Sequence, residues 1–105
     1  MSTTTTPDTA EHMIAILRAH EAELRCAGIR HLSLYGSVAR GDAQVDSDVD
    51  LLAELDPEAH IGLFALGAVE RRLAKLVGRP VDLLAEPIEK PRLRANIDRD
   101  LRRAF

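Results

Sequence analysis

Apolar residues recur along this chain at two different spacings, and the alternation between them predicts helices separated by strands. The predicted elements are a helix at 9–27, a strand at 29–35, a short helical turn at 37–40, a strand at 49–54, a helix at 61–76, a strand at 80–85 and a helix at 92–105. Gly28 directly follows the first long helix and Gly78 lies two positions after the second, and a glycine commonly ends a helix. This αβαβαβα order predicts an α+β fold with helices packed on a small three-stranded sheet.

The connections between the strands predict a mixed sheet. The helix at 61–76 is long enough to be a crossover, so the strands before and after it should be parallel. Its inner face is marked by residues at helical spacing, namely Leu63, Leu66, Val69, Leu73 and Leu76. A shorter connection joins the first two strands, which are expected to be antiparallel.

Length and composition favour one domain in the cytoplasm. The 105 residues suit a single domain, expected at 9–105 after a polar tail at 1–8 that should be disordered. The net charge of −3 argues against direct binding of DNA or RNA, because these partners select basic surfaces. No apolar run approaches the roughly 20 residues that cross a bilayer, and no secretory signal is seen. The single cysteine, Cys26, is expected to be a small buried residue.

Two carboxylates stand two positions apart at the start of the second strand. Side chains at this spacing point to the same side, with Cα atoms roughly 7 Å apart, so Asp48 and Asp50 should face one point. Two like charges held this close raise each other's pKa, and a divalent cation would relieve the repulsion. Hard oxygen ligands select Mg²⁺, which often takes one or two carboxylates together with substrate phosphates. The pair therefore predicts a magnesium site.

A third acid, Asp82, lies inside the apolar run of the third strand. If the second and third strands are neighbours, Asp82 lies beside Asp48 and Asp50, and the three carboxylates can bind one or two metal ions for an in-line phosphoryl displacement. The alternatives are that the acid pair is ordinary surface charge and that Asp82 caps the end of a strand. The combination of three acids with a glycine–serine turn favours the catalytic interpretation.

The turn after the first strand carries candidate phosphate ligands. Gly36 allows close approach of a ligand to the backbone, and Ser37 stands at a helix N-terminus, where N–H groups and the helix dipole favour an anion. Arg40 can contact phosphate or brace the acidic loop through Asp42 or Asp46. The alternatives for Gly36 and Ser37 are a turn residue and an N-cap.

The motif G-S-x-A-R-G-D at 36–42, followed by S-D-x-D-L at 47–51, resembles the signature of a known enzyme family. The family is the minimal nucleotidyltransferases (MNT) of the DNA polymerase β-like nucleotidyltransferase superfamily. The resemblance covers nearly the whole chain, and nothing in the motif departs from the family pattern. It implies the nucleotidyltransferase fold.

The resemblance also implies roles for individual residues. By it, Asp48, Asp50 and Asp82 are the catalytic acids that bind Mg²⁺, and Gly36 and Ser37 hold the triphosphate of ATP. The implied reaction is attack of a hydroxyl on the α-phosphate with release of pyrophosphate. Asp82 could help to deprotonate that hydroxyl.

The acceptor is implied only by the genes that accompany such proteins. Stand-alone members that resemble this chain, the MntA-like antitoxins, are encoded beside a helical HEPN protein. This implies an antitoxin that transfers AMP to a tyrosine of a cognate HEPN ribonuclease toxin. The alternatives are transfer to a small molecule with a helical partner subunit, and an antitoxin that acts by binding alone. The helix at 92–105 is either the docking element or a core-packing helix.

Overall fold

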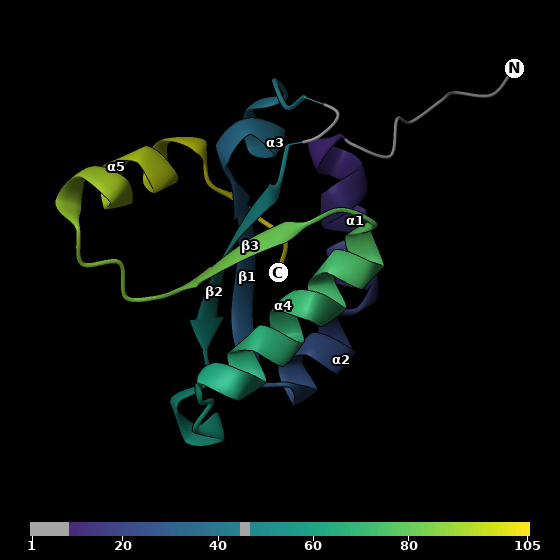
Figure 1. The fold of residues 1–105 in the computed structure, drawn as a ribbon, viewed down its shortest axis with the longest axis vertical. Coiled ribbons are helices and arrows are strands. Elements are labelled where there is room, and N and C mark those ends of the chain that lie inside the picture. Colours follow the sequence, from purple (N-terminus) through teal and green to yellow (C-terminus); the bar gives the residue numbers. More distant parts are fainter. Residues whose placement is uncertain (1–8, 45–46) are drawn as a thin grey trace, which may run out of the picture.

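The computed structural model describes residues 9–44 and 47–105, so the tail predicted at 1–8 and the loop residue Asp46 lie outside the described part. Its elements are α1 (Ala10–Ala19), α2 (Glu21–Cys26), β1 (Ile29–Tyr35), α3 (Gly36–Arg40), β2 (Val49–Leu55), the 3-10 turn η1 (Pro57–Ala59), α4 (Leu63–Val77), β3 (Val81–Ala85), α5 (Pro91–Asp100) and β4 (Arg102–Arg103). Figure 1 shows α1, α2 and α4 on one side of the sheet and α5 on the other. The predicted α+β class is confirmed, and β1 has the predicted bounds.

The sheet is mixed, as the connections predicted. Its strand order is β3-β2-β1-β4. β2 pairs antiparallel with β1 and parallel with β3, and α4 forms the crossover between the two parallel strands. This places β1 and β2 at the centre of the sheet, where both of their faces can be covered.

The sheet has a fourth strand that the sequence pattern did not predict. The helix expected at 92–105 ends at Asp100, and Arg102–Arg103 pair antiparallel with β1. The N–H of Ala104 then donates to the carbonyl of Leu32 at 2.8 Å, and Ala104 is 1% exposed. Without these residues, β1 would be an edge strand with unpaired backbone groups. The prediction of a helix through the last residues was therefore wrong, because pairing with β1 outweighs local helical spacing.

The helix predicted at 9–27 is divided into α1 and α2 at His20. The N–H of His20 donates to Leu17 at 3.2 Å, and the ring Nδ1 of His20 lies 2.9 Å from the carbonyl oxygen of Ile16. In a continuous helix that oxygen would be the acceptor for the His20 N–H. A polar side chain that takes over a helical acceptor competes with the helix backbone, so α1 ends there.

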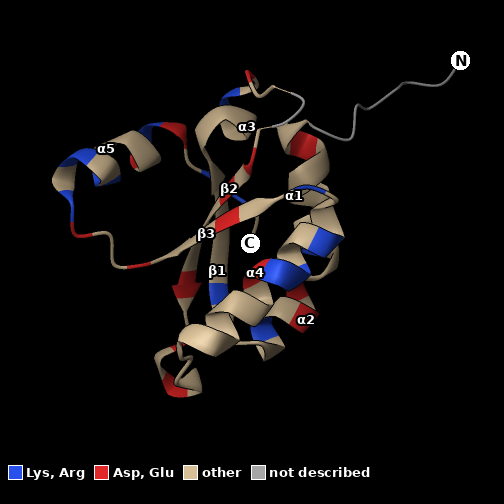
Figure 2. Ribbon diagram, viewed as in Figure 1, with Lys and Arg blue, Asp and Glu red and all other residues tan. Residues whose placement is uncertain are grey.

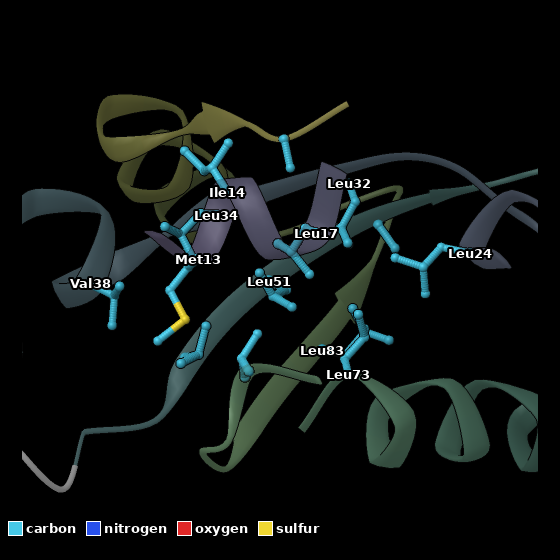
Figure 3. Packing of buried hydrophobic residues seen from close by; sticks show 14 of the residues in the cluster. Met13, Ile14, Leu17, Leu24, Leu32, Leu34, Val38, Leu51, Leu73 and Leu83 are labelled. Carbon is cyan, nitrogen blue, oxygen red and sulfur yellow. The ribbon is translucent and has the colours of Figure 1, made fainter. Parts of the chain in front are cut away.

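The main core lies between the sheet and the helices α1, α2 and α4 (Figure 3). Its fully buried side chains include Met13, Leu17, Leu24, Leu32, Leu34, Leu51 and Leu73. A smaller cluster on the opposite face joins Tyr35, Leu52 and Ile97. Ile97 is the buried residue of α5, so this single side chain carries much of the apolar contact between α5 and the sheet.

The first turn of α4 lies outside the core. Leu63 was predicted on the inner face of this helix, but it is 84% exposed. The buried residues of α4 are Val69, Leu73 and Val77. Figure 1 shows the N-terminal end of α4 beside η1, at the end of β2. Helical spacing defines a face but does not show where the sheet that covers it ends.

Two smaller points concern burial and membranes. Cys26 was expected to be buried and is exposed, because it lies two positions, or about 200° around the helix, after Leu24, the buried residue of α2. Within 9–44 and 47–105, no helix is long and apolar enough to span a membrane.

Candidate active site

Two carboxylates meet across the parallel strand pair. Asp50 of β2 and Asp82 of β3 are Cα partners in the ladder, so their side chains leave the same face of the sheet on strands about 4.8 Å apart. Tyr35 of β1 is the partner of Asp50 on its other side. Asp48 directly precedes β2. We call Asp48, Asp50 and Asp82 the acid trio; Figure 2 shows the acidic segments of β2 and β3 next to each other.

The acid trio creates an electrostatic strain at Asp50. Burial of the Asp50 carboxyl, followed by the charges of Asp82 and Asp48, raises its pKa, while the charge of Arg40 opposes this rise. Burial, followed by the charges of Asp50 and Asp82, raises the pKa of Tyr35 to about 12. The expected repulsion between the acids is therefore seen at Asp50, and a bound cation would relieve it.

The trio is not a complete metal site by itself. Among the residues that the structure describes, no three His, Cys, Asp or Glu side chains lie close enough together to hold a metal ion. Asp50 is half-buried, whereas Asp48 and Asp82 are exposed. Paired carboxylates that still need further oxygen ligands suit Mg²⁺, which commonly completes its shell with water and substrate phosphate. The donor set therefore fits Mg²⁺, and the assignment of the three ligands stays a prediction.

Gly36 is required by the position of Asp50. Its φ is +77°, and a Cβ added to it would lie 2.4 Å from Oδ2 of Asp50. The sequence pattern indicated close approach of a ligand at this glycine; in the structure, the group that approaches it closely is the carboxylate of Asp50. The glycine–serine turn thus packs directly against Asp50.

Ser37 lies in the first turn of α3 and does not cap it. The N-cap residue of α3 is Tyr35, and no side chain caps the helix, so the alternative that Ser37 is an N-cap is wrong. The carbonyl of Ser37 accepts from the N–H groups of Gly41 and Asp42, both at 3.0 Å. These bonds close the turn, and binding of phosphate by the Ser37 hydroxyl stays a prediction.

Arg40 braces the loop, as one of its two interpretations predicted. Its Nε donates to Asp42 at 3.1 Å and its Nη1 donates to Asp100 of α5 at 2.9 Å. Contact with nucleotide stays a prediction for Arg40. Sequence reasoning missed Asp100, because the helix predicted at 92–105 placed it in the helix interior, whereas α5 ends at Asp100 in the structure.

A second arginine, Arg79, contacts the residues before Asp48, and sequence reasoning missed it. Nη2 of Arg79 donates to the carbonyl of Gln44 at 3.0 Å and also to that of Ser47. The N–H of Val49 donates to the carbonyl of Pro80 at 2.9 Å. These contacts fix the start of β2 against the start of β3, which is where Asp50 and Asp82 meet.

The family of the chain follows from its comparison with known proteins. The model of the nucleotidyltransferase domain family matches residues 18–104, which include the acid trio and the glycine–serine turn. The chain belongs to this family. It is a nucleotidyltransferase, and the resemblance inferred from the motif is confirmed.

Similar proteins include a protein adenylyltransferase and several solved structures. The protein adenylyltransferase MntA of Thermococcus cleftensis is 42% identical over 77 residues, which is 72% of this chain and 76% of that protein. A solved structure of a protein assigned as a minimal nucleotidyltransferase is 31% identical, has a TM-score of 0.72, and covers 89% of this chain and 93% of its own. A chain of the complex between a tri-AMPylated Shewanella oneidensis HEPN toxin and an MNT antitoxin has a TM-score of 0.62 at 15% identity, and covers 88% of this chain and 71% of its own. The nucleotidyltransferase fold is thereby confirmed.

Proposed function

We propose that this protein is an antitoxin that transfers AMP from ATP to a tyrosine of a cognate HEPN ribonuclease toxin, with Mg²⁺ as cofactor. The observation that carries the proposal is the in-register pair Asp50 and Asp82, with Asp50 packed against Gly36. The support for the acceptor comes from relatives, namely a protein adenylyltransferase and an MNT antitoxin in complex with an AMPylated HEPN toxin.

Each residue of the site has a proposed role. Asp48, Asp50 and Asp82 would hold Mg²⁺, whose charge neutralises the triphosphate and its leaving group. The turn at Gly36 and Ser37 would hold the phosphates through backbone N–H groups and the serine hydroxyl. Orienting the reactants before reaction is a large part of the rate gain in phosphoryl transfer.

The reaction is a displacement at the α-phosphorus of ATP. The oxygen of the acceptor tyrosine forms a bond to this phosphorus, the bond to the bridging oxygen of the β-phosphate breaks, and pyrophosphate leaves. The proton of the tyrosine hydroxyl goes to a carboxylate. Asp82 is the proposed proton acceptor, because it is the exposed member of the in-register pair and is open to an incoming protein.

The test uses the purified protein, ATP labelled at the α-phosphate, Mg²⁺ and a co-expressed HEPN protein. We expect label on a tyrosine of the HEPN protein, identified by mass spectrometry as added AMP. Asp50→Asn and Asp82→Asn should each remove the label. Glu54→Gln is the matched control, because Glu54 is an acid of the same strand that lies outside the trio and faces Arg30.

Other outcomes decide between the remaining functions. Neutralisation of the toxin by Asp50→Asn without any label would favour an antitoxin that acts by binding alone. Label that appears only on a small molecule would favour the small-molecule enzyme. Unchanged labelling by Asp50→Asn would show that the site has been assigned to the wrong residues.

A further inference from the structure

The carboxylate of Asp100 connects the last helix to the turn that carries the active site. Asp100 ends α5, and its Oδ2 accepts a hydrogen bond from Nη1 of Arg40 at 2.9 Å. The two residues are 60 positions apart in the sequence. Nε of the same arginine is held by Asp42 at 3.1 Å, so two carboxylates fix one guanidinium from two sides.

The Asp100–Arg40 pair differs from ordinary surface ion pairs. The side chain of Asp100 is 9% exposed and that of Arg40 43%, whereas both members of the Arg25–Glu21 pair on α2 are open to water, at 43% and 40%. Water and salt screen an exposed pair strongly and a covered carboxylate much less. A geometry fixed by Asp100 should therefore persist in solution.

Asp100 is also unfavourably placed for its own helix. A negative charge in the last turn of α5 faces the negative end of the helix dipole. A covered carboxylate also loses hydration that a hydrogen-bonded cation must replace. Arg40 supplies that cation directly, while Arg99 is farther away at 3.8 Å. The ion pair with Arg40 of α3 therefore explains an aspartate at position 100, where α5 itself disfavours a negative charge.

The partner stands next to the site. Arg40 is the last residue of α3, the short helix that starts with Gly36 and Ser37. Its charge reaches Asp50, where it offsets part of the rise in pKa that burial and the neighbouring acids cause. Among the described residues, the bonds found for its guanidinium involve Nε and Nη1, so Nη2 remains for an added ligand such as a phosphate oxygen.

We propose that Asp100 is a positioning residue, which fixes the guanidinium of Arg40 so that it meets the triphosphate at the glycine–serine turn. Asp100 does not touch the reacting atoms and acts through Arg40. The inference rests on the proposed function for the identity of the ligand. The geometry of the pair itself is independent of that function.

The test measures the affinity of the intact protein for AMP-PNP with Mg²⁺ in a double-mutant cycle. Asp100→Asn keeps the shape of the side chain and removes its charge, and we expect Kd to rise about fivefold to tenfold. Arg40→Gln should raise Kd at least as much. In the Arg40→Gln background, Asp100→Asn should have no further effect, since its only route to the ligand is gone.

Asp98→Asn is the matched control. Asp98 is a carboxylate of the same helix, is 50% exposed and pairs with Arg94 at 2.9 Å. This variant should bind the nucleotide as the parent does. Equal Kd values for the parent and Asp100→Asn would overturn the proposal. An additional loss from Asp100→Asn in the Arg40→Gln background would also overturn it, because a merely structural role gives additive effects.

A second measurement separates this inference from the proposed function. NMR of ¹⁵N-arginine-labelled protein follows the Nη–H signals of Arg40, since Nη1 is the atom that donates to Asp100, and these signals are identified by their loss in Arg40→Gln. We expect slow exchange with water in the parent and in Asp98→Asn, and clearly faster exchange in Asp100→Asn. If the parent binds no nucleotide, the proposed function fails, while unchanged exchange in Asp100→Asn would still overturn the positioning role.

Discussion

A methyl group at Gly36 would have to occupy space that the carboxylate of Asp50 already fills, since the two would be 2.4 Å apart. The φ of +77° adds backbone strain for any residue with a Cβ. We expect Gly36→Ala to lower the free energy of unfolding by about 1–3 kcal/mol. It should also reduce nucleotide transfer by at least about 100-fold, the scale seen when one preorganised stabilising group is lost. Urea denaturation and the transfer assay measure the two effects.

Gly78 offers a control with almost the same backbone. Its φ is +72°, and an added Cβ would find no atom within 4 Å. Gly78→Ala should therefore show the backbone strain alone, about 1 kcal/mol, and keep full transfer activity. Equal losses of activity in the two variants would show that the clash with Asp50 is not what makes Gly36 necessary.

The charge of Asp50 should destabilise the metal-free fold. Because its pKa is raised above the ordinary value of an aspartate, the folded state binds the Asp50 proton more tightly than the unfolded state does. The free energy of unfolding therefore falls as the pH rises from the unfolded pKa through the folded one. In the presence of a chelator, Asp50→Asn should unfold at a slightly higher temperature than the parent at pH 7. The difference should vanish below about pH 4.

The same variant should be inactive, so stability and activity move in opposite directions. Mg²⁺ with AMP-PNP should raise the unfolding temperature of the parent, since ligands that bind only the folded state stabilise it. It should leave Asp50→Asn nearly unchanged. A parent that is more stable than Asp50→Asn at pH 7 without metal would contradict the electrostatic account.

At the level of elements, the sequence predicted what short-range rules control. β1 lies between Gly28, which follows α2, and Gly36, which begins α3, and its bounds were predicted correctly. The parallel pairing of β2 and β3 followed from the length of α4. The break at His20 was missed because it depends on the contact of the His20 ring with the carbonyl oxygen of Ile16, and the spacing of apolar residues does not predict such a contact.

Helix α4 shows how unequally one apolar face contributes to stability. Leu73 is fully buried, whereas Phe64, the second residue of the helix, is 94% exposed. Leu73→Ala should lower the free energy of unfolding by about 2–5 kcal/mol, because it leaves a cavity in the main core. Phe64→Ala should change it by less than about 0.5 kcal/mol. Urea denaturation of both variants checks this. A large loss in Phe64→Ala would mean that the first turn of α4 is covered in solution.

Contacts between segments that are distant in the sequence assemble the site. Such contacts are hard to predict from the sequence, so some residues of the site were missed. Asp50 and Asp82 could be placed together because strand alternation and the crossover rule are general. Asp100 could not be chosen among the acids of the last helix, since only folding brings it to Arg40. The acid trio was expected to surround a metal ion, but in the described part of the chain no three such side chains lie close enough together to hold one.

The C-terminal residues join the N-terminal helices to the sheet, and a charge placed among them should loosen the whole molecule. Ala104 is 1% exposed, its carbonyl accepts from Nε of Arg18 at 2.6 Å, and its N–H donates to Leu32 at 2.8 Å. Ala104→Asp should lower the free energy of unfolding by about 3 kcal/mol or more, because it buries a carboxylate in the core. Ala95→Asp, at an exposed position of α5, should cost only about 0.7 kcal/mol through helix propensity. If urea denaturation gave equal losses for the two variants, the C-terminal residues would not be packed on β1 in solution, and β1 would be an open edge of the sheet.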